Sequence, residues 1–213
     1  MSSDVLVTTP AQRQTEPHAE AVSRNRRQQA TFRKVLAAAM ATLREKSYAD
    51  LTVRLVAARA KVAPATAYTY FSSKNHLIAE VYLDLVRQVP CVTDVNVPMP
   101  IQVTSSLRHL ALVVADEPEI GAACTAALLD GGADPAVRAV RDRIGAEIHR
   151  RITSAIGPGA DPGTVFALEM AFFGALVQAG SGTFTYHEIA DRLGYVVGLI
   201  LAGANEPSTG GSE

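Results

Sequence analysis

A chain of 213 residues, 48% of them hydrophobic, can bury a sizeable core, which excludes a mainly disordered protein. The absence of tryptophan and the abundance of alanine and leucine favour helices over an all-β fold. The net charge is only -1, yet residues 24–89 hold twelve Lys/Arg against four Asp/Glu, whereas the rest of the chain holds eight against seventeen. This asymmetry predicts a polyanionic partner for the N-terminal third.

The amino-terminal segment is polar, and it has no apolar core long enough for a signal peptide. Residues 1–23 are therefore expected to be a disordered tail of a cytoplasmic protein. Residues 165–179 form the most apolar stretch but contain Glu169 and Gln178, so they are interpreted as a buried helix too short to cross a bilayer. No membrane association is expected.

The first half of the chain predicts four helices. Apolar residues at positions 32, 35, 36, 39, 40 and 43 follow helical spacing and indicate an amphipathic helix over 26–46. Thr52 can cap a second helix over 53–59. Pro64 can open a third, which ends at residue 71, because a first-turn N–H would be unpaired anyway. Ser72 or Ser73 can cap a fourth over 74–89.

The second half predicts a helical bundle. Prolines at positions 90, 98 and 100 mark a junction between domains. Helices are expected over 101–116 and 119–129, then over 135–156 and 162–179, each of the latter two opened by an Asp-Pro pair. A capping box formed by Thr185 and Glu188 opens a last helix that ends near residue 202. Residues 205–213 are expected to be a disordered tail.

The segment PATAYTYF, residues 64–71, is the second of two short helices that a tight turn joins, and a longer basic helix precedes them. This is the arrangement of a helix-turn-helix, whose second helix enters the DNA major groove. Small residues at its start let the backbone approach the bases. Thr66, Thr69 and Tyr68 can contact base edges, and Tyr70 can reach a phosphate. A helical hairpin with solvated arginines is the alternative, as is a core position for one of the tyrosines.

Residues 52–77, TVRLVAARAKVAPATAYTYFSSKNHL, resemble the DNA-binding signature of the TetR family of one-component transcriptional regulators. The resemblance is specific over about residues 26–79 and elsewhere extends only to helical architecture and length. It implies an all-α fold with a three-helix DNA-binding domain (24–73) and a larger helical ligand-binding and dimerisation domain (74–204) that begins with a linking helix (74–89). The residues expected to bind DNA are Thr52, Arg54, Lys61, Pro64, Ala65, Thr66, Tyr68, Thr69, Tyr70 and Lys74.

The signature departs from the family pattern at three positions. Lys61 occupies a turn position that is usually glycine, so a residue with a Cβ is expected in a left-handed conformation, at about 1–2 kcal/mol, unless the turn takes another shape. Lys61 could instead add a phosphate contact. Ala63 provides no side-chain cap, a loss of about 1 kcal/mol. Ala65 replaces a usual glycine and slightly limits close approach to DNA.

The resemblance also implies a homodimer and a small-molecule effector. The last two long helices are more apolar than one buried face requires, so they can form a four-helix interface with a second copy. The dimer candidates are Phe166, Met170, Phe173, Val177, Leu193, Val197 and Ile200. The scarcity of polar residues indicates a hydrophobic effector, and the ligand candidates are Tyr82, Leu107, Leu110, Cys124, Leu128, Glu169 and Phe172. A partner arginine for Glu169, Arg108 or Arg143, is favoured over a ligand contact.

No cofactor, metal site or enzyme activity is expected. Cys91 and Cys124 form no C-x-x-C pair and are interpreted as buried structural residues. Residues 187–191, HEIAD, lack the final histidine of a zinc-protease motif, and GPGADPG at 157–163 lacks the lysine of a phosphate loop. The sequence thus predicts a dimeric repressor that binds a palindromic operator in double-stranded DNA. The alternative, a carrier of apolar molecules without DNA binding, leaves the basic N-terminal third unexplained.

Overall fold

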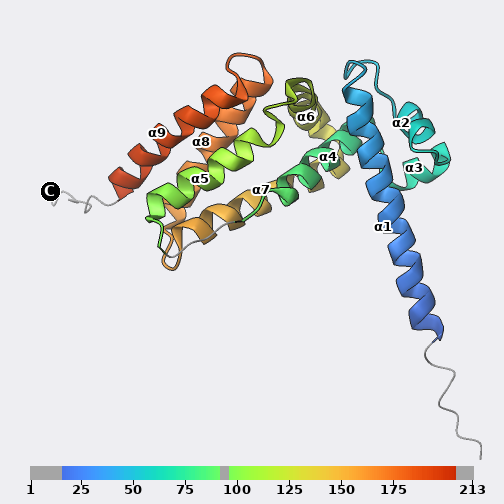
Figure 1. Ribbon diagram of the computed structural model, residues 1–213, viewed down its shortest axis with the longest axis horizontal. Helices are drawn as coiled ribbons and strands as arrows, with labels where there is room; N and C mark the ends of the chain where they lie inside the picture. The colour runs from blue at the N-terminus through green and yellow to red at the C-terminus, as the bar shows by residue number, and fades with distance from the viewer. Residues whose placement is uncertain (1–15, 92–95, 205–213) are drawn as a thin grey trace, which may run out of the picture.

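The computed structural model describes residues 16–91 and 96–204, and all regular structure in these ranges is helical, which confirms the predicted all-α fold (Figure 1). The helices are α1 (Glu16–Leu43), α2 (Val53–Arg59), α3 (Pro64–Tyr70), α4 (Lys74–Gln88), α5 (Met99–Ala111), α6 (Pro118–Asp130), α7 (Pro135–Ile156), α8 (Pro162–Gly180) and α9 (Tyr186–Ala204). Short 3₁₀ turns follow α5 (Leu112–Val114) and α6 (Gly131–Ala133).

The N-terminal domain consists of α1, α2 and α3, packed around buried residues that include Val35, Val56, Ala67 and Phe71. Helix α1 begins at Glu16, ten residues before the predicted start, so the expectation of a disordered segment is wrong for residues 16–23. That segment has no apolar stripe, but its glutamates and alanines are good helix formers. The N-terminal part of α1 extends away from α2 and α3 (Figure 1). Residues 1–15 and 205–213, the other predicted tail segments, lie outside the described residues.

Local capping explains where five of the described helices begin. In each case a side-chain oxygen accepts a hydrogen bond from a backbone N–H of the first turn, which would otherwise lack a partner. Ser73, rather than Ser72, caps α4. The predicted capping box of α9 forms, because the Thr185 N–H donates to Glu188 at 2.8 Å and the Glu188 N–H donates to Thr185 at 3.1 Å. The remaining caps are Thr52 for α2, Asp134 for α7 and Asp161 for α8.

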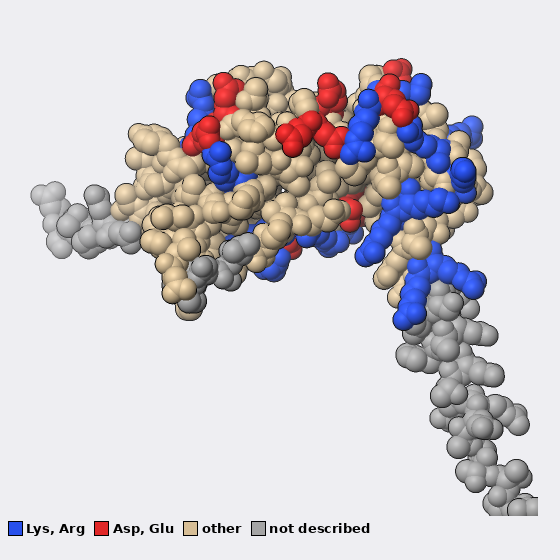
Figure 2. Space-filling view, viewed as in Figure 1, with Lys and Arg blue, Asp and Glu red and all other residues tan. Residues whose placement is uncertain are grey.

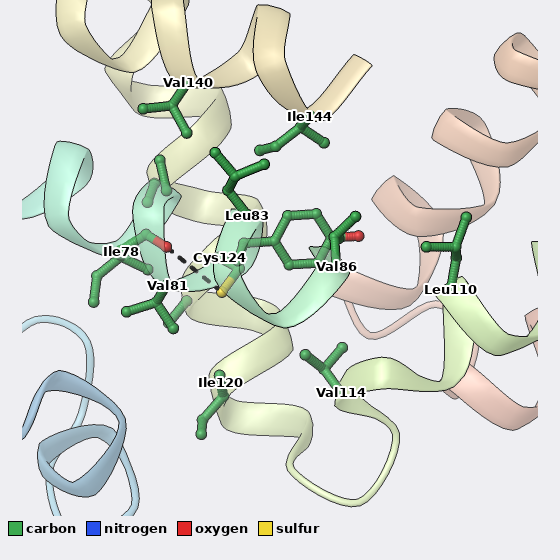
Figure 3. Packing of buried hydrophobic residues seen from close by; sticks show 14 of the residues in the cluster. Ile78, Val81, Leu83, Val86, Leu110, Val114, Ile120, Cys124, Val140 and Ile144 are labelled. Carbon is green, nitrogen blue, oxygen red and sulfur yellow. Dashed lines mark hydrogen bonds between the residues drawn. The ribbon is translucent and has the colours of Figure 1, made fainter. Parts of the chain in front are cut away.

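Helix α4 is shared between the N-terminal domain and the C-terminal bundle. It packs against α1 on one side and against α6 and α7 on the other. Figure 3 shows this packing, with Ile78, Val81, Leu83 and Val86 of α4 beside Ile120 and Cys124 of α6 and Val140 and Ile144 of α7. The Cys124 thiol is buried and lies 3.9 Å from the Ile78 carbonyl oxygen. The helix that follows the N-terminal domain is therefore part of the core and not a free linker.

The C-terminal bundle contains α5 to α9. Helix α9 packs on α5 and α8, and α7 packs on α4 and α5. Helix α8 is long and apolar enough to cross a membrane by length and composition, so the expectation that this segment is too short was wrong. One such helix is weak evidence for a membrane span, because core helices of soluble proteins also meet this criterion. Only 22% of the apolar window of α8 is buried, so the interpretation as a buried helix was also wrong. Cys91 is exposed, contrary to the expectation of burial.

Candidate DNA-binding surface and ligand cavity

The turn between α2 and α3 has the backbone conformation that the sequence predicts. Lys61 adopts φ 54°, in the left-handed region. Its N–H donates to Ala58 O at 3.1 Å, and the Val62 N–H donates to Ala57 O at 3.0 Å, so the last turn of α2 is closed. Ala63 provides no side-chain cap for α3, and Pro64 opens the helix. Both features follow directly from residues at which the sequence departs from the family pattern.

Helix α3 presents a mostly uncharged surface. Ala67 is buried against the domain, whereas Ala65, Thr66, Tyr68 and Thr69 are exposed. Tyr68 is the largest of these exposed side chains, with 46% of its surface accessible. The helix therefore offers a ring, methyl groups and hydroxyls, with no charge of its own.

Tyr70 and Lys74 also contact the protein itself. The ring of Tyr70 packs edge-on against Phe32, with centroids 6.0 Å apart, so its ring adopts the predicted alternative of packing on the core. The Lys74 ammonium donates to the Tyr48 carbonyl oxygen at 3.1 Å and lies 4.3 Å from the centroid of the Tyr48 ring. The Tyr48 hydroxyl donates to Asn75. Lys74 thus fastens the start of α4 to the segment after α1, and part of its hydrogen-bonding capacity is used there.

The excess positive charge gathers on the N-terminal domain, where Figure 2 shows Lys and Arg along α1 and around the helix-turn-helix. Two of the arginines are paired: Arg59 forms a bidentate ion pair with Glu45, and Arg44 forms an ion pair with Glu117. The exposed cations without a recorded partner in the described chain include Arg54 and Lys61 of the helix-turn-helix, and Arg26, Arg27, Arg33 and Lys34 of α1. These free cations can neutralise phosphates.

A cavity of about 660 Å³ lies among α4, α6, α7 and α8. Four predicted ligand residues line it: Tyr82, Cys124, Leu128 and Glu169. The other three predicted residues, Leu107, Leu110 and Phe172, are fully buried in the core and do not line it. Residues that the sequence analysis did not propose as ligand residues complete the wall, among them Thr125, Ile144, Gly145, His149, Phe173, Leu176 and Tyr186.

The charged groups of the cavity are on α7 and α8. Glu169 pairs with His149, with Oε1 and Nδ1 2.8 Å apart. The predicted arginine partners are elsewhere, because Arg108 pairs with Asp191 and Arg143 pairs with Glu80. The prediction that Glu169 has a partner within the protein was correct, but the partner is a histidine and not the predicted arginine. No group of three metal-ligating side chains is found among the described residues.

The wall formed by α4 and α6 is uncharged. Tyr82 is 5% exposed, and its hydroxyl has no hydrogen-bond partner among the described residues. Burial raises the pKa of the adjacent Cys124 thiol to about 12, so the group stays protonated. Burial likewise raises the pKa of Tyr186, against the opposing effect of a hydrogen bond with Thr125. A Cβ at Gly121 would lie 2.3 Å from the Tyr186 hydroxyl, so glycine is needed there for the tyrosine to fit.

The N-terminal domain matches the model of a known family. Residues 35–81 match the family model of bacterial regulatory proteins, tetR family, and this range spans the helix-turn-helix and the first part of α4. The N-terminal domain of the chain is therefore similar to that of TetR-family regulators.

Solved structures with this fold cover most of the chain. A TetR transcriptional regulator from Rhodococcus sp. RHA1 is 21% identical, with a TM-score of 0.69 over 84% of this chain and 98% of that one. FadR from Thermus thermophilus, a TetR-family repressor in complex with lauroyl-CoA, is 18% identical, with a TM-score of 0.60 over 85% and 99%. FadR from Bacillus subtilis, in complex with stearoyl-CoA, is 14% identical, with a TM-score of 0.54 over 81% and 98%. The TetR-family fold thus extends through the C-terminal bundle.

The chain exposes a large apolar face on α8 and α9. Of the predicted dimer residues, Phe166, Met170 and Val177 are exposed, by 61%, 51% and 43%. Phe173 and Ile200 are half-buried, and Phe173 and Val177 also line the cavity. Leu193 and Val197, at 2% and 1% exposure, belong to the protomer core, because α9 has apolar residues on more than one side. Tyr195 and Leu199 are the large exposed apolar residues of α9 instead, at 72% and 56%.

Polar contacts fasten α4 to α7 along its whole length. At its start, the Ser73 hydroxyl donates to Asp134 at 2.8 Å. In its middle, the buried Glu80 carboxylate accepts a hydrogen bond from Arg143 at 2.5 Å and lies 3.6 Å from His76. At its end, the buried Arg151 donates to the carbonyl oxygens of Val86 at 3.0 Å and Val89 at 2.7 Å. Helix α7, which lines the cavity, is thereby joined to the helix that follows the DNA-binding domain.

Proposed function

We propose that this protein is a dimeric transcriptional repressor of the TetR family that binds a palindromic operator and releases it when an apolar small molecule enters the cavity. The observation that carries the proposal is the position of α4. This helix begins at the helix-turn-helix, through Ser73 and Lys74, and forms part of the cavity wall two turns later, through Tyr82. A ligand in the cavity therefore acts on the element that sets the position of the DNA-binding domain.

In the proposed complex, α3 lies in the major groove. Arg54, Thr66 and Tyr68 face bases, and Thr69 offers a methyl and a hydroxyl beside them. Thr52, Lys61, Tyr70 and Lys74 contact phosphates, while Pro64 and Ala65 let the backbone approach the DNA. The exposure of Arg54, Lys61, Thr66 and Tyr68 supports these roles. Tyr70 and Lys74 would reach phosphates with groups that already pack on the protein.

The proposed dimer forms through α8 and α9. A contiguous exposed apolar face of this kind is uncommon on monomers and typical of interfaces. A two-fold dimer also fits a palindromic operator, because each copy then meets an equivalent half-site. The domain division proposed for this arrangement is 24–73 for DNA binding and 74–204 for ligand binding and dimerisation, with α1 adding helical structure before residue 24.

The proposed effector is hydrophobic. A volume of about 660 Å³ is within the range of roughly 300–1,000 Å³ typical of small-molecule sites. The lining is largely aliphatic and aromatic, with its charges confined to a few residues of α7 and α8. Two proteins of the same fold were solved with long-chain acyl-CoA molecules, which supports a cavity that accepts apolar chains.

The proposal is tested by binding of the purified protein to its own upstream DNA, in a salt titration against a scrambled competitor. Selective binding that weakens steeply with salt is expected, since each phosphate contact adds about 0.9 to the slope of log K against log salt. The double variant Arg54→Ala with Tyr68→Ala should lose selectivity, by about tenfold or more for each base contact removed. Arg87→Ala, at the far end of α4, is the matched control and should bind like the wild type. Absence of any DNA binding at low salt would refute the regulator and favour the carrier of apolar molecules.

A further inference from the structure

The largely apolar cavity contains a carboxylate that the protein compensates only in part. Glu169 lies on the cavity side of α8, since Phe173 and Leu176, four and seven residues later, also line the cavity. Its side chain is 19% exposed, so a bound molecule can reach it although most of it is removed from water. The other carboxylate of the lining, Asp142, is exposed on α7. A carboxylate placed as Glu169 is remains unfavourable unless hydrogen bonds and an opposite charge compensate it.

The hydrogen bonding of Glu169 leaves one of its two oxygens unused. Oε1 lies 2.8 Å from Nδ1 of His149, and the described residues provide no other partner for the carboxylate. Oε2 is not among the unpaired side-chain atoms that are sealed from solvent, so it has accessible surface. His149 is itself 60% exposed, so its ring stays hydrated. Oε2 is thus an accessible acceptor on the cavity side of α8.

The arginines of α7 nearest to this carboxylate are used elsewhere. Arg143, Arg150 and Arg151 form ion pairs with other carboxylates. Arg141 lines the cavity, but it precedes His149 by eight residues, which is about 12 Å along the helix. Among the described residues, the free oxygen is therefore left without a cation.

The free oxygen determines which ligand group fits beside it. A carboxylate or a phosphate would place a second negative charge next to the first at low dielectric, which is strongly unfavourable. A neutral group would displace water from Oε2 without balancing its charge. A protonated amine donates a hydrogen bond to Oε2 and neutralises it, and charge-assisted bonds of this kind are the stronger ones. Apolar wall residues such as Leu128, Ile144 and Phe173 can receive the rest of the molecule.

We infer that the effector is a lipophilic cation, an apolar molecule with one protonated amine, and that this amine donates a hydrogen bond to Oε2 of Glu169. The inference rests on the proposed role of the cavity as the effector site, and it adds the chemical class of the ligand to that role. Glu169 is then the residue that selects a cation over an anion or a neutral molecule. The bound charge lies where α8 meets His149 of α7, the helix that is fastened to α4.

The inference is tested by isothermal titration calorimetry on the full-length protein without DNA, with three probes of equal chain length: decylammonium, decanol and decanoate. The measurement is made at about pH 8, at which free imidazole is uncharged and alkylamines are protonated. The wild type should bind decylammonium at least about tenfold more tightly than decanol, which is the usual effect of one charge-assisted hydrogen bond. Decanoate should bind more weakly than decanol. A wild type that binds decylammonium no more tightly than decanol would overturn the inference.

Two variants locate the effect. Glu169→Gln keeps the shape of the side chain and an acceptor for His149 but removes the charge. It should lower the affinity for decylammonium at least about tenfold, to that for decanol, and change the affinity for decanol itself by less than about twofold.

Asp142→Asn is the matched control, because Asp142 also lines the cavity but precedes His149 by seven residues, about 10 Å along α7. Its preference for decylammonium should stay within about threefold of the wild-type value, since a hydrated charge at that distance acts weakly. An unchanged preference in Glu169→Gln, or an equal loss in Asp142→Asn, would contradict the role assigned to Glu169.

A third variant tests the cavity itself. Gly145 lines the cavity, and a Cβ built there meets nothing within 4 Å, so Gly145→Leu should fill the volume without a clash at Cβ. All three probes should then bind at least about tenfold more weakly, whereas Gly145→Ala should retain most of the binding. Unchanged binding in Gly145→Leu, or no binding of any probe by the wild type, would exclude the cavity as the site and the inference with it. Operator binding is measured separately in the salt titration, so failure of the regulator proposal is distinguished from failure of the inference.

Discussion

Replacing Lys61 by glycine should stabilise the protein, because the native backbone at this residue is one that glycine adopts freely. Lys61 has φ 54°, and a side chain with a Cβ costs about 1–2 kcal/mol in this region. Glycine removes that cost but raises the conformational entropy of the unfolded chain, which offsets about 0.4–1 kcal/mol. The expected net gain for Lys61→Gly is about 0.5–1 kcal/mol, or a rise in Tm of about 1–4 °C for a chain of this size.

The assay is urea and thermal unfolding at one fixed protein concentration, since the stability of the proposed dimer would depend on concentration. Lys61→Ala is the control, because alanine removes the charge but keeps the Cβ in the same conformation. It should leave the unfolding free energy close to that of the wild type. In DNA binding, the two variants should lose the same amount of salt dependence, about one unit of slope per phosphate contact removed. Equal stability of the two variants, or a less stable glycine variant, would refute the argument from backbone strain.

Three further predictions concern stability and assembly. Arg151→Met should lower the unfolding free energy in urea by about 2–4 kcal/mol, because the carbonyl oxygen of Val89 and the carboxylate of Glu147 lose a buried cation. The control Arg150→Met, at an exposed arginine, should lower it far less. Burial alone would raise the pKa of Glu80, but its histidine and arginine neighbours hold it below the ordinary value of 4.5. The ionised Glu80 therefore stabilises the folded protein above about pH 4.5, and this contribution is lost as pH falls through the lowered pKa. Glu80→Gln should reduce the loss of unfolding free energy at acid pH, in unfolding measured as a function of pH. Met170→Arg should give monomers in analytical ultracentrifugation, whereas Ile101→Arg, at an equally exposed apolar residue of α5, should not.

The helix starts could be predicted because capping is local. Asp134-Pro135 and Asp161-Pro162 each place an acceptor beside the first unpaired N–H groups, and both helices begin there. The left-handed turn at Lys61 was predictable from the family resemblance, because the matching position is usually glycine, the residue that adopts this conformation freely. The early start of α1 was not predicted, because residues 16–23 carry no apolar periodicity that would mark a packed face.

The cavity could be predicted only in part. Leu107 and Leu110 belong to α5, which does not line the cavity, and Phe172 directly precedes the lining residue Phe173 on α8, yet all three are fully buried in the core. Periodicity identifies the face of a helix that points inward, but whether neighbouring helices fill the space opposite depends on tertiary packing. Phe173 and Val177 lie four and eight residues after Glu169, a spacing that could have placed them on the cavity side.

The fastening of α4 to α7 also determines how small a ligand-induced change can be and still reach the DNA. Fifteen residues of helix span about 22 Å, and contacts at its start, middle and end prevent the helix from bending independently of α7. A tilt of this rigid pair by about 5° about the C-terminal end of α4 would displace the start of α4 by about 2 Å. Hydrogen bonds to bases are lost beyond about 3.5 Å, so a shift of this size carries α3 out of register with its half-site. The proposed response therefore requires no hinge between the two helices, because α4 and α7 would move together.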